Sequence, residues 1–188
     1  MKRVYSIGHS TRSILDFIGI LEKYCIKTLV DIRTVPRSKR NPQFNEDSLS
    51  TSLTVGGITY VHLKELGGFR KPLQDSINFG WRNESFRGYA DYMQSTEFET
   101  GLKRLIDLIE SGDTVSFMCA EAVPWRCHRS LVGDSLVVRG IEVIDILDER
   151  YSKPHVLTSW AKVDGLQITY PSPNAKITSG DEVQSSAC

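Results

Sequence analysis

Residues 119–129 form the part of the sequence with the most side chains that could do chemistry. The segment reads CAEAVPWRCHR and holds, in order, Cys119, Glu121, Arg126, Cys127, His128 and Arg129. A helix that begins near His128 would present unpaired N–H groups and a partial positive charge. Together with the two arginines, this start would favour an anion and would activate a nearby thiol as a nucleophile. The pattern predicts an anion or phosphate site.

The cysteines leave several interpretations open. A cysteine at a strand end followed by an arginine at a helix start is similar to cysteine-dependent phosphatases and sulfurtransferases, in which a backbone loop holds an oxyanion around a thiolate. Here six residues separate Cys119 from Arg126, which is not the usual spacing, and Pro124 removes one loop N–H. Alternatively, Cys119 and Cys127 are small buried residues of the core.

A zinc or redox site is a further alternative. Cys119, Cys127, His128 and His9 are suitable metal ligands. Their spacing matches no familiar zinc finger or ribbon, and the adjacent Cys127 and His128 cannot easily bind one ion. We therefore assign no metal ligand and leave the cofactor unknown.

Two other strand ends carry polar groups. Gly8-His9-Ser10 offers room for close approach, an imidazole that can exchange protons near neutrality, and a hydroxyl able to cap a helix. It is not a G-x-G-x-x-G fingerprint. Asp31 and Arg33 alternate along a strand, so they face the same side and could form an ion pair that directs the arginine toward a ligand.

The middle of the chain is basic and aromatic. Residues 33–87 hold nine basic and five acidic side chains, whereas the whole chain has no formal net charge. Arg37, Ser38 and the cations that follow are interleaved with planar rings from Phe44 to Tyr89. This combination suits phosphates and stacked bases. Solvated loop charges, with the rings forming a small local core, are the alternative.

Composition limits the class of protein. The chain has 188 residues, of which 40% are hydrophobic and 24% charged, as in an ordinary globular protein. No apolar run approaches the roughly 18 residues of a membrane span. The first residues lack the apolar region of a secretory signal, so we expect a cytoplasmic protein with no membrane partner. The four cysteines are too few and too uneven for a disulfide framework, and we expect reduced thiols.

Apolar patterns predict alternating strands and helices. Strands are expected near residues 4–7, 28–32, 58–62, 114–118 and 142–147. Helices are expected after Ser10 or Thr11, from Asn45 to about Val55, as two abutting helices within 89–110, and from 128 to 139. Residues 63–87 show no clear period, and such a long irregular insertion is usually functional or mobile.

These elements predict an α/β fold. We expect a doubly wound, mainly parallel five-stranded sheet with helices on both faces, a Rossmann-like three-layer sandwich, over residues 1–150. Residues 151–188 would be a C-terminal extension that is partly disordered from about 171. Ligands of such sheets bind at the carboxyl ends of the strands. Nearly every predicted strand delivers a titratable or nucleophilic group to that edge.

Motifs spread from about residue 3 to residue 147 resemble one known family. In chain order they are Ser6-Ile7-Gly8-His9-Ser10, Asp31-Ile32-Arg33 followed by Pro36 and Ser38, Tyr60 followed by Leu66-Gly67-Gly68, Phe86-Arg87-Gly88-Tyr89-Ala90-Asp91-Tyr92-Met93, and Cys119-Ala120-Glu121 with Cys127-His128-Arg129. They resemble the domain of unknown function 488 family, whose activity is not established. The resemblance implies functional residues at His9, Ser10, Asp31, Arg33, Cys119, Glu121, Cys127, His128 and Arg129.

Two functional hypotheses follow. The first is an enzyme that acts on a phosphorylated small molecule or nucleotide-like ligand at the carboxyl edge of the sheet. Its catalytic residues would be His9, Cys119, Glu121, Cys127 and His128, and its ligand-binding residues Ser10, Asp31, Arg33, Arg37, Ser38, Arg126 and Arg129. The second is a non-catalytic nucleic-acid-binding module that uses residues 33–89. The sequence does not indicate an oligomeric state.

Overall fold

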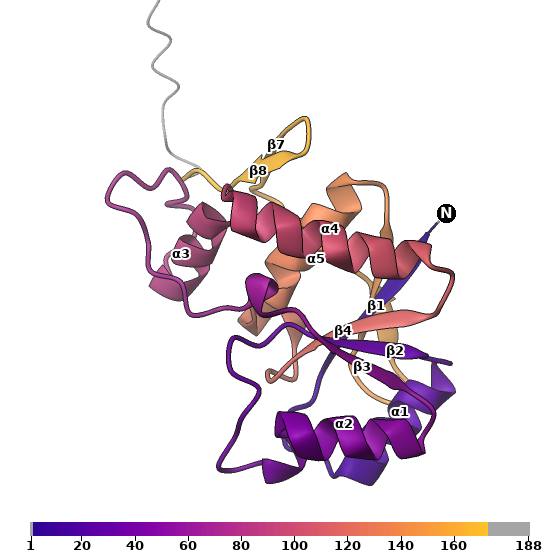
Figure 1. Ribbon diagram of the computed structural model, residues 1–188. Coiled ribbons are helices and arrows are strands. Elements are labelled where there is room, and N and C mark those ends of the chain that lie inside the picture. The colour runs from indigo at the N-terminus through magenta and orange to yellow at the C-terminus, as the bar shows by residue number, and fades with distance from the viewer. Residues whose placement is uncertain (1, 173–188) are drawn as a thin grey trace, which may run out of the picture.

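A mainly parallel, six-stranded sheet forms the centre of the molecule (Figure 1). The computed structural model describes residues 2–172. The strands are β1 (Arg3–Gly8), β2 (Thr28–Asp31), β3 (Thr59–His62), β4 (Val115–Cys119), β5 (Glu142–Ile146) and β6 (Ser152–Pro154). Their order across the sheet is β3-β2-β4-β1-β5-β6, and only β6 runs antiparallel. The predicted α/β fold is confirmed, with six strands in place of five.

The sixth strand escaped prediction because it is short and lacks an apolar pattern. It pairs at the sheet edge with β5, where Pro154 can be tolerated because an edge strand need not donate from every N–H. The next residue continues the pairing, since the His155 N–H donates to the Val143 carbonyl at 2.8 Å. The sheet is therefore extended by a segment beyond the predicted α/β region.

Helices cover both faces of the sheet (Figure 1). They are α1 (Ile14–Lys23), α2 (Glu46–Val55), α3 (Glu84–Tyr92), α4 (Thr96–Glu110) and α5 (Arg129–Val138). The chain moves outward from β1 to β3 with α1 and α2 on one face, then returns through β4 to β5 with α3, α4 and α5 on the other. Opposite directions of travel need opposite faces if every crossover is right-handed. Among the described residues, no helix is long and apolar enough to cross a membrane.

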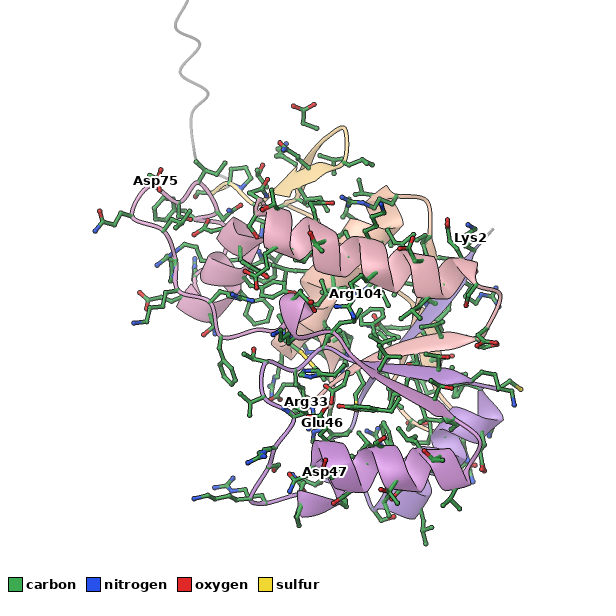
Figure 2. The ribbon with its side chains drawn as sticks, in the orientation of Figure 1. Lys2, Arg33, Glu46, Asp47, Asp75 and Arg104 are labelled. Carbon is green, nitrogen blue, oxygen red and sulfur yellow. A yellow bond between two sulfur atoms is a disulfide. The ribbon has the colours of Figure 1, made fainter. Side chains whose placement is uncertain are left out.

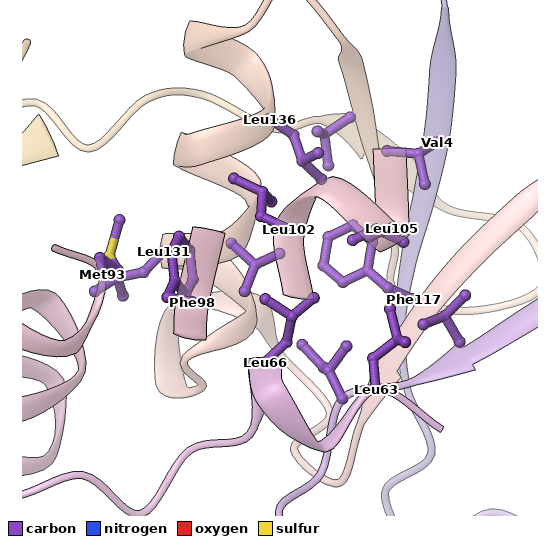
Figure 3. Packing of buried hydrophobic residues seen from close by; sticks show 14 of the residues in the cluster. Val4, Leu63, Leu66, Met93, Phe98, Leu102, Leu105, Phe117, Leu131 and Leu136 are labelled. Carbon is purple, nitrogen blue, oxygen red and sulfur yellow. The ribbon is translucent and has the colours of Figure 1, made fainter. Parts of the chain in front are cut away.

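Each face of the sheet has its own apolar core. On the α4 side, Val4, Phe117 and Leu131 pack with residues of α4 such as Leu102 and Leu105 (Figure 3). On the α1 side, Ile7, Leu29 and Met118 pack against Phe17 and Phe44. Because side chains alternate along a strand, neighbouring strand residues belong to different cores. This alternation also decides to which side each polar residue at the strand ends points.

The first helix begins later than predicted. Ser13, not Ser10 or Thr11, is its N-cap, and the Ser13 hydroxyl oxygen accepts from the Asp16 N–H at 3.1 Å. Ser10 has a φ of 51°, in the left-handed region that is uncommon outside glycine. Its hydroxyl does not cap the helix, so this residue shapes the turn after β1.

Residues 152–170 pack against the domain. After β6, the strands β7 (Lys162–Asp164) and β8 (Gln167–Thr169) form a hairpin, and Ile168 and Tyr170 are buried in the core of the α4 side. Sequence analysis gave no structure for this segment. The predicted disorder from about residue 171 falls on residues 173–188, which lie outside the described residues.

A buried network of charges ties this segment to α5 and β5. The His155 ring contacts Asp134 Oδ1 through Nε2 and Asp145 Oδ2 through Nδ1, both at 3.0 Å. Tyr170 donates its hydroxyl to Asp134 Oδ2 at 2.8 Å, and Ser6 donates to Asp145. Burial alone would lower the pKa of His155, but the hydrogen bonds and charges of the two aspartates outweigh burial and raise this pKa to about 9.

The raised pKa makes a prediction about stability. The protonated imidazole contributes fully below pH 6.5, and its contribution is lost as pH rises through about 9. The shift corresponds to a contribution on the order of 3 kcal/mol. We expect His155→Gln to lower the free energy of unfolding by roughly that amount at pH 6. At pH 10 the difference between wild type and variant should be much smaller.

Urea denaturation of the oxidised wild type and variant at several pH values measures this difference. A difference that stays constant from pH 6 to pH 10 would show that His155 is not charged in the folded protein.

Candidate functional site

The carboxyl end of β4 is the switch point of the sheet topology. Its neighbours β1 and β2 send their following segments to the α1 and α2 face, whereas β4 sends its loop to the face of α5. Ligands of open α/β sheets bind where adjacent connections diverge in this way. The segments that meet there are 8–10, 31–34 and 119–123. Topology therefore selects the same edge that the sequence predicts.

Strand alternation divides the residues at this edge between the two faces. Gly8 pairs with Cys119, and Cys119 belongs to the core on the α4 side. His9, one residue further, points to the other face, where its ring stacks on Phe44 with centroids 4.2 Å apart. The predicted residues thus form two clusters, one with the sulfur atoms and one with the imidazole of His9, on opposite sides of the same strand ends.

The sulfur cluster contains a disulfide between Cys119 and Cys127. Their Cα atoms lie 7.5 Å apart, and Figure 2 shows the sulfur–sulfur bond in yellow near the centre of the molecule. The structure thus joins two sulfur atoms that were expected to be reduced thiols, although the 7.5 Å between their Cα atoms exceeds the roughly 4.4–6.8 Å that a disulfide usually spans. Their separation of eight positions in the sequence gave no sign of pairing, because the contact forms only when the loop after β4 folds back onto the start of α5. Cys25 is a free, exposed cysteine.

Arg129 lies beneath this loop and is only 1% exposed. Its Nη1 donates to Cys119 Sγ at 3.2 Å and to the Glu121 carbonyl at 3.1 Å. Within residues 2–172 it forms no ion pair with a carboxylate, and its Nε has no hydrogen-bond partner. Burial lowers its pKa to about 10. A buried cation without a partner charge is costly, so this side chain favours an anion beside it.

The loop above Arg129 provides further donors. In the described part of the chain, the backbone N–H groups of Glu121, Ala122 and Val123 donate to no protein group, and all three residues are at least partly exposed. Unpaired N–H groups of consecutive loop residues form concave sites for anions. The loop therefore offers exposed hydrogen-bond donors above the buried Arg129 side chain.

Cys127 Sγ has two polar neighbours. The Arg129 backbone N–H, at the start of α5, donates to Cys127 Sγ at 3.4 Å. His128 Nε2 donates to the Ile32 carbonyl at 3.0 Å, which leaves Nδ1 unprotonated and 3.5 Å from the same sulfur. Burial lowers the pKa of His128 to about 4, so its ring is neutral at pH 7 and is a hydrogen-bond acceptor rather than a strong base.

The imidazole cluster on the other face is internally satisfied. His9 Nδ1 donates to the Ser10 carbonyl at 2.8 Å, and its Nε2 accepts from Arg33 Nη1 at 3.3 Å. Burial lowers the pKa of His9 to about 4, so its ring is also neutral. Both ring nitrogens are thus in use, and the ring is 2% exposed. His9 holds Arg33 and the turn after β1 in place.

Asp31 and Arg33 form the predicted ion pair. Arg33 Nε lies 2.9 Å from Asp31 Oδ1, and Tyr60 donates to Asp31 Oδ2 at 2.8 Å. Arg33 also donates to the Phe44 carbonyl at 2.8 Å. Figure 2 shows Arg33 between the sheet and the start of α2. With these bonds most of the guanidinium is committed inside the protein, so the pair joins β2, β3 and the loop before α2.

The remaining predicted residues lie around the same edge of the sheet. Glu121 and Arg126 are exposed on the loop between the cysteines, and Arg37 is exposed on the loop after β2. Ser38 has a structural contact, since its N–H donates to Asn45 Oδ1 at 2.7 Å. Asn45, the predicted cap of the next helix, therefore uses its side chain for this loop and makes no capping bond.

Sequence analysis missed three residues that shape the site. Arg12 donates to the carbonyls of Gly8 and Leu147 and so ties the ends of β1 and β5 together. Tyr60 completes the Asp31 pair, and Gly68 packs directly on the His128 ring. Tyr60 and Gly68 lie in motifs that carried the family resemblance, which was the one available signal for them.

The cysteines and His9 do not form a common ligand set. Among the described residues, no group of three or more His, Cys, Asp or Glu side chains is arranged to hold a metal ion. His9 lies across the sheet from the sulfur atoms, as the alternation of β1 requires.

A family comparison agrees with the motifs. The family described as Domain of unknown function DUF488 matches residues 13–136, which is well over half of the chain. The chain belongs to the DUF488 family. The matched region of this DUF488 protein ends within α5 and includes Cys119 and Cys127 as well as Arg33 and Arg129. No curated protein and no solved structure matches the chain.

The packing of Gly8 gives a test of the loop after β4. A methyl group at Gly8 would overlap the Glu121 carbonyl and lie 2.8 Å from Arg129 Nη1. We expect Gly8→Ala to destabilise the protein by at least about 3 kcal/mol. Gly19 is the matched control, because a methyl group there meets nothing within 4 Å. Gly19→Ala in exposed α1 should stabilise by about 0.5–1 kcal/mol.

Chemical denaturation of both variants measures these effects. Equal stabilities of the two variants would contradict the close approach of the Glu121 loop to β1.

The environment of Cys127 predicts its reactivity after reduction. The Arg129 N–H at the start of α5 favours the thiolate. In reduced protein, the rate of alkylation of Cys127 by iodoacetamide should reach half its maximum at a lower pH than that of exposed Cys25. Peptide mass spectrometry separates the two sites in one sample. Superimposable pH profiles would show that the neighbours do not activate Cys127.

Proposed function

We propose that this DUF488 protein is a thiol-dependent enzyme that acts on a phosphorylated or nucleotide-like ligand at the carboxyl end of β4. One observation carries the proposal. Arg129 is buried without a carboxylate partner, with one nitrogen on Cys119 Sγ and another without a partner. A guanidinium that only supported the fold would be expected to have a partner charge, as Arg33 does.

The two cysteines would have different roles. Cys127 has an N–H donor of the α5 start at its sulfur, which stabilises a thiolate, so it would be the better attacking nucleophile. The sulfur of Cys119 faces Arg129, whose charge would stabilise a thiolate released there. The disulfide would be the oxidised state of the pair. Two external thiols would supply two electrons and two protons to reduce it, and would leave as their own disulfide.

The anion would be held between Arg129 and the loop above it. Unpaired N–H groups at 121–123 would bind phosphate oxygens, and the exposed Arg126 would add positive charge beside them. Because both His9 nitrogens are occupied, Glu121 is the more accessible group to exchange protons with a ligand. Asp31 and Arg33 would act as positioning residues that fix the strand ends.

Arg129→Met tests the proposal. The variant removes the charge and keeps much of the volume, and no carboxylate loses its partner. We therefore expect it to fold with a loss below about 2 kcal/mol. In reduced wild type, millimolar inorganic phosphate or AMP should protect Cys127 from iodoacetamide. In Arg129→Met and in Arg129→Ala, protection should require at least a tenfold higher concentration.

Two controls make the result decisive. Alkylation of Cys25 should be unaffected by phosphate in every protein, and Cys119→Ser should keep phosphate protection, since the anion is held by Arg129 and the loop. If the folded Arg129 variants are protected as wild type is, Arg129 does not hold the anion. If wild type shows no protection, no anion binds beside the sulfur atoms. Either result contradicts the proposal.

A further inference from the structure

Phe69 is an exposed aromatic side chain held at the edge of the sulfur cluster. Its ring is 88% exposed, and its φ of 56° lies in the left-handed region. A bulky residue in this conformation costs of order 1 kcal/mol, and such residues gather at binding sites. An exposed phenylalanine contributes little to folding, and its left-handed backbone distinguishes it from the other exposed large apolar residues.

The backbone around Phe69 is fixed against the site. Thr34 Oγ1 donates to the Gly68 carbonyl at 2.9 Å, and Gly68 packs on the His128 ring, which contacts Cys127 Sγ. Arg70 Nε donates to the Gly67 carbonyl at 3.3 Å, and the Arg70 guanidinium lies 3.6 Å from the centroid of the Tyr92 ring. Both neighbours of Phe69 are thus anchored while its ring is exposed to solvent, one residue after the glycine that packs on His128.

A second exposed ring flanks the cysteines from the other loop. Trp125 lies in the short turn η3 (Pro124–Arg126), two residues before Cys127, and is 54% exposed. Lys153 Nζ lies 4.6 Å from the centroid of the Trp125 ring. Lys153 covers one face of this ring, so a planar group would stack on the other face. The site therefore has an exposed aromatic side chain on each of two loops.

Unpaired cations surround the same edge. Lys39, Arg40, Lys71 and Arg126 are exposed and, within residues 2–172, form no ion pair. They belong to three loops that follow β2, η2 (Lys64–Leu66) and β4, and residues 33–87 as a whole carry an excess of four positive charges. One phosphate group could not contact three separate loops, whereas a chain of phosphates could.

We propose that the ligand of this site is a single-stranded polynucleotide, whose bases stack on Phe69 and Trp125 while its phosphates contact Lys39, Arg40, Lys71 and Arg126. Separate aromatic side chains within a positive surface are the usual means of binding single strands, since every base has a face that can stack. That the polynucleotide is the substrate of a reaction rests on the proposed function. That it binds to the protein does not. It narrows the ligand from a phosphorylated molecule to a polymer.

Fluorescence anisotropy of the full chain with labelled 12-nucleotide single-stranded DNA and RNA tests the proposal. Binding should weaken with salt, with a slope of about −0.7 in log–log form for each phosphate contacted. Phe69→Gly removes the ring and relieves the left-handed backbone, so it should fold well. It and Trp125→Ala should each weaken binding roughly 5- to 100-fold, and Phe69→Tyr should restore it.

The double variant Lys39→Ala/Arg40→Ala should reduce the salt slope by about 1.4. Lys27→Ala and Val55→Ala are matched controls, because both residues are exposed at the opposite edge of the sheet. They should bind as wild type does. Duplex DNA, whose bases are not free to stack, should bind more weakly than single strands.

Three results would overturn the proposal. The first is no binding of the labelled strand at 50 mM salt, and the second is ring variants that bind the strand as wild type does. The third is heparin that displaces the labelled strand equally well from wild type and from the ring variants. Phosphate protection of Cys127 should persist in Phe69→Gly. A failure of polynucleotide binding with protection intact would therefore reject this inference alone. If the Arg129 variants keep the phosphate protection of wild type while polynucleotide binding is intact, the proposed enzymatic function alone is rejected.

Discussion

A buried guanidinium without a partner carboxylate is the constraint around which this edge of the protein is organised. Arg129 reaches from the start of α5 under the loop after β4, and its position requires glycine at residue 8 and a carbonyl-rich loop above it. Two sulfur atoms lie beside it. The free energy of burying the charge is partly offset by the Glu121 and Ala122 carbonyls and by the charge of Asp145, and an anion beside the guanidinium would offset it further.

The polar residues at the strand ends differ in hydrogen-bonding state between the two faces of the sheet. On the α4 side, the sulfur atoms, Arg129 and His128 have unfilled donor or acceptor capacity and adjoin exposed loops. On the α1 side, His9, Asp31 and Arg33 bond to one another and leave little capacity for a ligand. The second cluster fixes the strand ends on which the first is built, so similar residue types serve reactivity on one face and rigidity on the other.

Helix α5, which carries Arg129 at its start, is held in place at Asp134 by residues 152–170. Asp134 of α5 accepts from Tyr170 and contacts His155, while Asp145 of β5 contacts the same imidazole. Gly133 lets that ring approach the helix closely. A protonated imidazole between two carboxylates is a strong buried interaction, because each charge is compensated within hydrogen-bond distance. The segment after β5 therefore supports the helix on which the site depends.

Apolar periodicity alone was enough to predict the parallel strands, most helices and the edge at which polar groups gather, since burial on two faces leaves a direct pattern in the sequence. Motifs alone indicated Cys119, Cys127 and Arg129. Side-chain alternation places His9 and the cysteines on opposite faces of the sheet. Predicting this placement would require each strand end to be known to within one residue. The Cys119–Cys127 contact, the unpaired state of Arg129 and the docking of 152–170 were decided by the tertiary structure, because each depends on which loop covers which strand end, and loop paths follow no periodic pattern.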